Sequence, residues 1–392
     1  GKTVVAALAA LQTISGGYQV ALMAPTEILA EQHLANFTQW LEPLGLAPGW
    51  LSGKSKGASR EMTLHGLAKG NIQLVIGTHA LFQEDVAFHQ LGLVIVDEQH
   101  RFGVHQRLAL REKSNHSFGL PHQLVMTATP IPRTLAMTAY ADLDTSIIDE
   151  LPPGRTPVNT AVLGNDRRGD VVQRINRACR EGNQAYWVCT LIEESEALQV
   201  QAAEATAEQL VQALPQVKVG LIHGRMKTKQ KTMAMERFKA GDIQLLVATT
   251  VIEVGVDVPN ASLMVIENAE RLGLAQLHQL RGRVGRGARE SHCLLLYQSP
   301  LSIAGKARLA VMRDSNDGFY IAEKDLELRG PGQVLGTEQT GMMSFRVADI
   351  ARDSGLLDQV KLASETIQQD HPDIIDSLID RWIGERADYG NV

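Results

Sequence analysis

Cysteine is scarce in this sequence. Its 392 residues include only Cys179, Cys189 and Cys293, and no two of them form a CxxC pair. Closely spaced cysteine pairs indicate zinc sites, and an even, regular set in a small secreted chain indicates disulfides. We therefore expect a cytoplasmic protein that has neither a zinc site nor a disulfide framework.

Long apolar runs and an excess of positive charge are also missing. No run approaches the roughly 20 apolar residues that cross a bilayer, and no signal peptide is visible, so we expect no membrane partner. The net charge of −6 argues against a uniformly basic nucleic-acid binder. A local basic groove remains compatible with that charge.

The length and composition are those of a multidomain globular protein. A chain of 392 residues is too long for a single core, so two or three domains are expected. Hydrophobic residues make up 44% and charged residues 21%, which is ordinary for a soluble globular chain.

An apolar run that ends in two carboxylates is the most informative stretch. Leu93 to Val96 is typical of a strand buried on both faces, and Asp97 and Glu98 follow it directly. Open α/β sheets bind ligands at the carboxyl ends of their strands. We predict that Asp97 holds Mg²⁺, directly or through water, and that Glu98 polarises an attacking water.

The first three residues, Gly1-Lys2-Thr3, match the end of a phosphate-binding loop. In such a loop the lysine reaches the β- and γ-phosphates and the threonine binds Mg²⁺. An apolar helix is predicted over 4–14, with a stop at Gly16 and Gly17. The strand and glycines that precede this lysine in a complete loop are missing, so we interpret the chain as a fragment with weakened ATP binding.

Further strand patterns alternate with helical ones in the first part of the chain. Strands are predicted over 20–23, 72–76 and 123–126, and each ends in small polar residues. Thr26 is placed to cap a helix over 28–41. This alternation predicts a parallel, doubly wound sheet.

The alternation restarts after a proline-rich stretch at 150–155, which we interpret as a linker. Strands are predicted over 185–189, 217–222, 243–247, 263–266 and 293–297, without a second phosphate loop. Arg283 and Arg286 are three residues apart, so they would share a face if they lay on a helix. Two such arginines suit the charge on a transferring γ-phosphate, although a solvated basic helix is the simpler alternative.

The last part of the chain has a helical pattern. Residues 318–341 contain several glycines and Pro331, which predict a helical hairpin with a loop. An apolar stripe for core packing is predicted at Ile374, Ile375, Leu378, Ile379, Trp382 and Ile383.

The ordered set of these stretches resembles the motifs of a superfamily 2 helicase. The stretch 318–341 resembles a translocation motif of a branch of these enzymes that moves on double-stranded DNA. The matching stretches are 1–3 (motif I), 24–27 (motif Ia), 97–100 (motif II), 127–129 (motif III), 248–257 (motif V) and 279–286 (motif VI).

The resemblance implies an α/β fold with two RecA-like parallel-sheet domains, followed by a helical hairpin and C-terminal helices. The expected boundaries are 1–150, 151–300 and 301–392, without the amino-terminal wedge domain of this branch. The implied activity is ATP-driven translocation that remodels stalled replication forks and Holliday junctions, in DNA repair and recombination, by a monomer that uses ATP and Mg²⁺.

The resemblance also implies roles for individual residues. Gly1, Lys2, Thr3, Asp97 and Asp257 would bind the nucleotide, with Thr3 and Asp97 as the Mg²⁺ ligands. Glu98, Gln279, Arg283 and Arg286 would act in catalysis, and Thr127, Thr129, His100, Arg329 and Gln339 would couple hydrolysis to movement.

Three alternatives remain open at this point. The chain could be a DNA- or partner-binding fragment without turnover, because the phosphate loop is cut. It could instead be an RNA helicase, which shares the first motifs, although the stretch 318–341 speaks against this. A translocase similar to the transcription-repair coupling factor is the third alternative.

Overall fold

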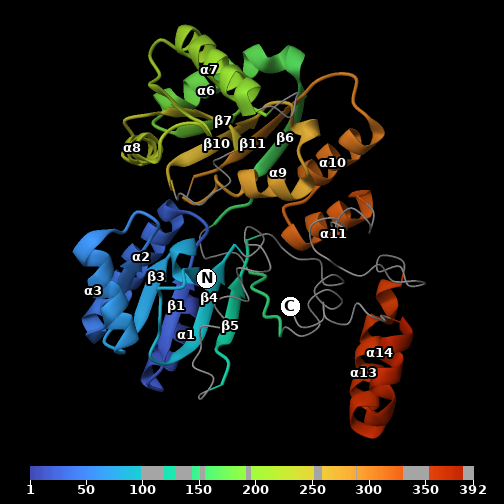
Figure 1. The fold of residues 1–392 in the computed structure, drawn as a ribbon. Helices are drawn as coiled ribbons and strands as arrows, with labels where there is room; N and C mark the ends of the chain where they lie inside the picture. Colours follow the sequence, from blue (N-terminus) through green and yellow to red (C-terminus); the bar gives the residue numbers. More distant parts are fainter. Residues whose placement is uncertain are drawn as a thin grey trace. The chain divides into compact units, whose positions relative to one another are not determined.

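The protein forms two α/β units, each built on one parallel sheet (Figure 1). The computed structural model describes residues 1–98, 119–128, 144–150, 155–190, 196–250, 258–287, 289–329 and 353–382. The first unit consists chiefly of the described residues within Gly1–Ala128, and the second chiefly of those within Pro153–Glu253 and Asp257–Val392. The expectation of two parallel-sheet domains is confirmed.

The sheet of the first unit has five parallel strands in the order β2-β3-β1-β4-β5. The strands are β1 (Gln19–Met23), β2 (Gly49–Leu51), β3 (Leu74–Gly77), β4 (Leu91–Asp97) and β5 (His122–Met126). Four of them were predicted. β2 was missed because a three-residue strand carries too little alternation to be recognised.

Helices cover both faces of this sheet, because successive strand side chains point to opposite faces. Val20 and Leu22 pack with α1 (Lys2–Ser15) and α2 (Glu27–Leu41) on one face. Ala21 and Met23 pack on the other face with Leu67 of α3 (Gly57–Ala68) and with η2 (His79–Phe82). A short η1 (Glu42–Leu44) follows α2.

The boundaries of α1 and α2 follow local sequence signals. α1 ends at Ser15, and Gly16 is its C-cap, as the glycine pair predicted. α2 begins after Thr26, whose hydroxyl accepts a hydrogen bond of 3.4 Å from the backbone N–H of Leu29. This confirms the predicted N-cap, which satisfies one of the unpaired donors in the first turn.

The second unit has a six-stranded parallel sheet in the order β6-β11-β10-β7-β9-β8. Five of its strands were predicted, and β6 was missed. β6 lies at the sheet edge, where it pairs with β11, and its residues are half-buried or exposed. The strands are β6 (Asn159–Gly164), β7 (Gln184–Val188), β8 (Val219–Ile222), β9 (Leu245–Ala248), β10 (Ala261–Ile266) and β11 (His292–Tyr297).

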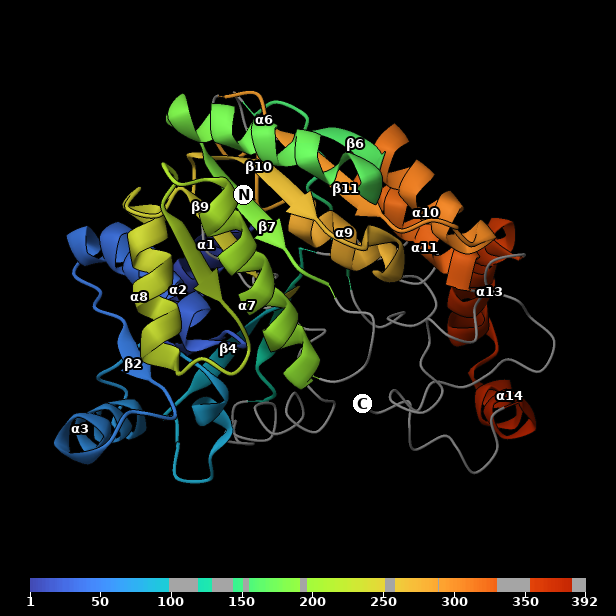
Figure 2. The same ribbon diagram turned by 90° about the horizontal axis from the view of Figure 1, so that it is seen from above.

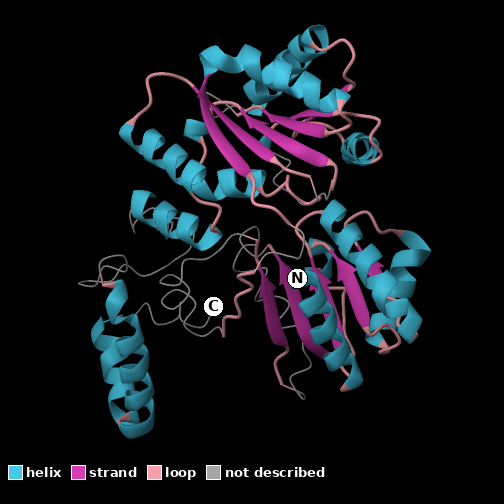
Figure 3. Ribbon diagram, turned by 180° about the vertical axis from the view of Figure 1, so that it is seen from behind, coloured by secondary structure: helices cyan, strands magenta, loops and turns pink. Residues whose placement is uncertain are grey.

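Neighbouring aromatic residues of β7 define the two faces of this second sheet. On one face, Trp187 packs in a core together with side chains of α6 (Arg168–Arg180) and α7 (Glu196–Ala213). Tyr186 contacts Phe238 of α8 (Thr228–Lys239), with 4.8 Å between the ring centroids. Figure 3 shows the strands of each sheet flanked by helices. The remaining elements of this sheet region are η5 (Asn165–Arg167), η7 (Ala269–Arg271) and α9 (Leu274–Arg281).

Helices follow the second sheet, as expected. α10 (Ile303–Asp314) and α11 (Gly318–Arg329) lie side by side (Figure 2). α11 is the start of the predicted hairpin, and the rest of that stretch lies outside the described residues. The later elements are η8 (Ser354–Leu356), α13 (Leu357–Asp370), η9 (Pro372–Ile374) and α14 (Ile375–Trp382).

The prediction that the stripe near the end of the chain packs in a core is wrong at two positions. Ile374 is 39% exposed and Leu378 is 36% exposed. α14 contacts η9, the short element that directly precedes it along the chain. Periodicity identified the helix but could not supply a partner for it. In the part of the chain that the structure describes, no helix is both long and apolar enough to span a membrane.

Candidate functional site

The carboxyl edge of the first sheet carries the two predicted acidic residues. β4 is buried along most of its length, ends at Asp97, and is paired there with Met126 of β5. Glu98 follows as the first residue beyond the strand. Both carboxylates therefore occupy the edge at which parallel α/β sheets bind ligands, as the sequence indicated.

The backbone of Glu98 is held in an unusual conformation. Its φ is +55°, in the left-handed region that costs a non-glycine residue about 1–3 kcal/mol. Its N–H is shared between the carbonyl oxygen of Met126 at 2.9 Å and Oδ1 of Asp97 at 3.1 Å. Oε2 of Glu98 lies 3.5 Å from the N–H of Ala128. The end of β5 thus fixes Glu98 and brings two predicted motifs together.

The side chain of Asp97 has a partner that was not predicted. Oδ2 lies 2.7 Å from Nε2 of His33, and the side chain of Asp97 is only 14% exposed. His33 lies on α2 in one row with the buried Leu29 and Phe37, which are four residues before and after it. A histidine in an otherwise apolar buried row is the signal that could have identified it.

Gly1-Lys2-Thr3 lies at the start of α1. Gly1 is the N-cap, and Lys2 and Thr3 are half-buried in the first turn. α1 ends at Ser15, only a few residues before β1 begins at the amino edge of the sheet. The helix runs antiparallel to β1, so its N-terminus points to the carboxyl edge, where Asp97 lies. A helix N-terminus at this edge favours a phosphate.

The donor atoms at this edge fit magnesium. Mg²⁺ prefers oxygen ligands and is held by one or two carboxylates together with substrate phosphates and waters. Asp97 supplies a carboxylate and Thr3 a hydroxyl, both half-buried. Within the described residues, no three His, Cys, Asp or Glu side chains gather into a closed metal cage. The edge therefore suits an ion that arrives with a nucleotide.

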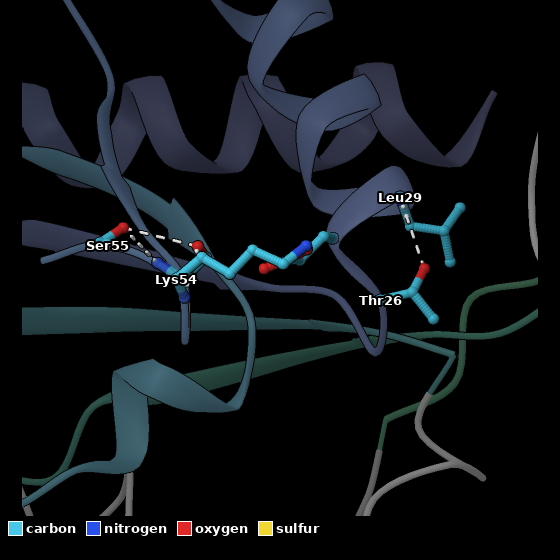
Figure 4. Close-up of polar contacts among 6 residues, drawn as sticks. Thr26, Leu29, Lys54 and Ser55 are labelled. Carbon is cyan, nitrogen blue, oxygen red and sulfur yellow. Dashed lines mark hydrogen bonds and ion pairs between the residues drawn. The ribbon is translucent and has the colours of Figure 1, made fainter. Parts of the chain in front are cut away.

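A second polar group lies around the start of α2 and the loop after β2. Lys54 pairs with Glu27, the first residue of α2, and the Lys54 side chain is 63% exposed. Oγ of Ser55 accepts a hydrogen bond of 3.0 Å from the N–H of Ser52. Figure 4 shows the extended Lys54 side chain and the Thr26 hydroxyl facing the N–H of Leu29. Only Thr26 of this group was predicted.

The predicted arginines of the second unit do not lie on a helix. α9 ends at Arg281 with Gly282 as its C-cap, and the left-handed backbone of Gly285, with φ of +76°, is incompatible with a helix through 283–286. Arg283 and Arg286 therefore lie beyond α9, and the condition under which they would share a helix face is not met. Arg283 is 8% exposed, whereas Arg286 is exposed and its Nε donates to the carbonyl oxygen of Gly282 at 3.2 Å.

The remaining predicted residues differ in what the structure says of them. Gln279 is half-buried on α9, and Thr127 follows β5 directly. Arg329 is the last residue of α11, and its side chain is not described. His100, Thr129, Asp257 and Gln339 lie outside the described residues.

Three family models match successive parts of the chain. The DEAD/DEAH box helicase model matches residues 1–138, and the helicase conserved C-terminal domain matches residues 169–288. A third model, for the C-terminal part of domain 3 of the ATP-dependent DNA helicase RecG, matches residues 315–378. The order of the three models agrees with the order of the two sheets and the helices that follow them.

Relatives with known names match along the whole chain. The ATP-dependent DNA helicase RecG of Escherichia coli K12 is 63% identical over 392 residues, which is all of this chain and 57% of the relative. The RecG of Haemophilus influenzae is 62% identical over 392 residues, again all of this chain and 57% of the relative. The chain thus spans a little over half the length of these curated relatives.

Solved structures agree with this. A structure of RecG bound to a three-way DNA junction matches with a TM-score of 0.73 and 44% identity, over 91% of this chain and 46% of that one. Yeast Dbp5 bound to RNA and ADP BeF3 has a TM-score of 0.56 at 16% identity, a likeness of fold alone. By its successive family models, its relatives and its fold, the chain belongs to the RecG family of superfamily 2 helicases.

Proposed function

We propose that this chain is the ATP-driven motor of a helicase that translocates on double-stranded DNA and remodels branched DNA, including stalled forks and Holliday junctions. The observation that carries the proposal is the pair Asp97 and Glu98 at the end of β4, with Glu98 held by the end of β5. The RecG relatives and the RecG structure on a three-way junction support DNA as the substrate.

The first unit supplies the nucleotide-binding residues in this proposal. Lys2 and Thr3, at the N-terminus of α1, bind the phosphates, and Thr3 and Asp97 bind Mg²⁺. When bound, Mg²⁺ neutralises the charge that develops on the transferring phosphoryl group. Glu98 orients and deprotonates the attacking water, since its carboxylate lies beyond the end of β4 and contacts the backbone N–H of Ala128.

The second unit supplies positive charge. We assign Arg283 and Arg286 to the stabilisation of the γ-phosphate in the transition state, with Gln279 and Asp257 beside the nucleotide. Arg286 is the exposed member of the pair, so it is the more accessible to a ligand. Thr127, Thr129, His100, Arg329 and Gln339 are assigned to the coupling of hydrolysis to movement.

The proposal extends to organisation. Residues 1–150 form the ATP-binding domain, 151–300 the helicase C-terminal domain and 301–392 the hairpin and terminal helices. The protein acts as a cytoplasmic monomer without a membrane partner, in DNA repair and recombination. The family resemblance and the low cysteine content support these assignments.

The decisive variant is Glu98→Gln in the full-length protein. It removes the carboxylate but keeps the size of the side chain, so ATP binding should persist while hydrolysis falls by about 10²–10⁴-fold. ATPase activity is measured with branched DNA, with unbranched duplex DNA, with single-stranded RNA and without nucleic acid, and the unwinding of junctions is measured in parallel. The matched control is Glu84→Gln, at an exposed position in the same unit. It should leave ATP binding and hydrolysis unchanged.

The same measurement tests the alternatives. Stimulation by RNA alone would favour an RNA helicase. No turnover by residues 1–392 under conditions in which the full-length protein is active would favour a binding fragment. Stimulation by unbranched duplex DNA without unwinding of junctions would favour a translocase similar to the coupling factor. Unchanged hydrolysis in Glu98→Gln would remove Glu98 from the mechanism.

A further inference from the structure

His33 holds one oxygen of the carboxylate that is proposed to bind magnesium. Nε2 of His33 and Oδ2 of Asp97 are 2.7 Å apart, and His33 is 6% exposed. The other oxygen, Oδ1, accepts the backbone N–H of Glu98 at 3.1 Å. Each oxygen thus accepts from one donor, and the two hydrogen bonds together restrict rotation of the carboxylate.

The direction of this hydrogen bond follows from chemistry. An ionised carboxylate only accepts, so Nε2 of His33 is the donor. Nδ1 is buried and has no hydrogen-bond partner among the described residues. The ring therefore makes one polar contact, and that contact is to Asp97. Burying a polar ring among apolar side chains costs free energy that its hydrogen bonds must offset. The single hydrogen bond to Asp97 is therefore the contact that stabilises His33 at this position.

The contact leaves Asp97 able to bind a metal ion. A carboxylate has about four lone-pair sites, and the two hydrogen bonds use one on each oxygen. The remaining lone pairs would be available to an ion or to its bound water. Without the histidine, the side chain could rotate about its own bonds, and Mg²⁺ tolerates little departure from octahedral geometry.

We propose that His33 is a positioning residue for the magnesium site, which orients the carboxylate of Asp97 from the buried face of α2. This inference rests on the proposed function, in which Asp97 binds Mg²⁺. It also means that α2, which begins at the Thr26 cap and the Glu27–Lys54 pair, carries the group that orients the metal ligand. Hydrogen-bonded supports of metal ligands typically contribute about 10–100-fold to metal affinity or activity.

Two variants separate the hydrogen bond from the volume of the ring. In His33→Gln the side-chain amide can reach the position of Nε2 and donate to Asp97, whereas the shorter amide in His33→Asn cannot. Affinity for Mn²⁺ with ADP, measured by electron paramagnetic resonance on the full-length protein, should fall by about 10–100-fold in the Asn variant. The Gln variant should stay close to the wild type.

A second readout excludes a merely structural role. ADP binding in EDTA should be unchanged in both variants, and raising Mg²⁺ should restore the kcat of the Asn variant. Phe37→Leu, on the same buried row of α2, is the packing control. It should lower the melting temperature and leave Mn²⁺ affinity intact.

The outcomes distinguish this inference from the function on which it rests. If Asp97→Asn leaves Mn²⁺ affinity unchanged, the metal site itself is wrong. If Asp97→Asn weakens Mn²⁺ binding while His33→Asn does not, His33 has no positioning role. Equal loss in Phe37→Leu and His33→Asn would overturn the inference as well, because packing would then explain the effect.

Discussion

Arg281 donates a hydrogen bond of 2.8 Å through Nη1 to the carbonyl oxygen of Met312, which joins the end of α9 to the end of α10. The same atom contacts the carbonyl oxygen of Ser315 at 2.8 Å and the hydroxyl of Thr160 at 3.4 Å. Arg281 is 3% exposed, and burial lowers the pKa of its guanidinium. It lies in the same stretch as Arg283 and Arg286, yet its contacts are structural.

We expect Arg281→Met to destabilise the protein. The substitution retains much of the volume but leaves the buried carbonyl oxygen of Met312 and the partly buried one of Ser315 without this donor, which costs about 1–3 kcal/mol. Urea denaturation of the wild type and variant measures the difference. The control is Arg180→Met, at an exposed position of α6. Its free energy of unfolding should stay within about 0.5 kcal/mol of the wild-type value. A loss no greater than that of Arg180→Met would show that the Arg281 contacts add nothing.

His278 makes stability depend on pH. Burial, with Arg281 nearby, lowers its pKa from 6.5 to about 4, and its Nδ1 lies 3.2 Å from Nη2 of Arg281. Below pH 6.5 the unfolded chain takes up a proton that the folded chain refuses, so stability is lost as pH falls from about 6.5 to about 4. Well above pH 6.5 the histidine is neutral in both the folded and the unfolded chain, so it adds no dependence of stability on pH.

His278→Gln should therefore reduce the fall in stability between pH 6.5 and pH 4. Melting temperatures across this range measure it. The exposed His65→Gln is the control, and it should keep the wild-type dependence on pH. Identical pH profiles for wild type and His278→Gln would contradict the assignment.

The three cysteines should be inert in the folded protein. All are buried and free, and burial raises the pKa of Cys293 to about 12 and that of Cys179 to about 11. Burial also raises the pKa of Cys189. The thiolate is the reactive form, so a disulfide reagent at pH 8 should react slowly before unfolding and fast in denaturant. Rapid labelling of the native protein would show that at least one thiol is accessible.

Thr26 should contribute to stability through its cap. Thr26→Ala removes the acceptor for the N–H of Leu29, which typically costs about 0.5–2 kcal/mol, whereas Thr26→Ser should retain most of it. Chemical denaturation measures both. Thr63→Ala, in α3, removes a hydroxyl that donates to a helical carbonyl rather than capping, and should have a smaller effect.

Arg329 tests the coupling assigned to the end of α11. In the full-length protein, Arg329→Ala should leave DNA binding and most ATPase activity intact while impairing the unwinding of branched DNA. Circular dichroism melting detects the alternative, in which the arginine only stabilises the helix. Normal unwinding by a well-folded variant would refute the coupling role.

Local patterns were enough to predict most of the architecture. Apolar runs that end in polar residues predicted β1, β3 and β4, because a parallel strand buried on both faces must be apolar throughout. β5 is less buried, but its apolar residues 124–126 were also recognised. The acids after β4 and the Thr26 cap followed from the same local rules. β2 and β6 escaped because a short or half-exposed strand has too weak a pattern.

What the sequence by itself determined is therefore the type and order of the elements, and the edge of the sheet at which Asp97 and Glu98 lie. Only the tertiary structure decided their partners. His33 meets Asp97 across 64 positions, and Arg281 meets Met312 across 31. Such contacts depend on how helices pack on a sheet, because packing brings together side chains whose separation along the chain carries no periodic signal. The contacts of Arg281 at the end of α9 are of this kind, and Arg283 lies beyond that helix.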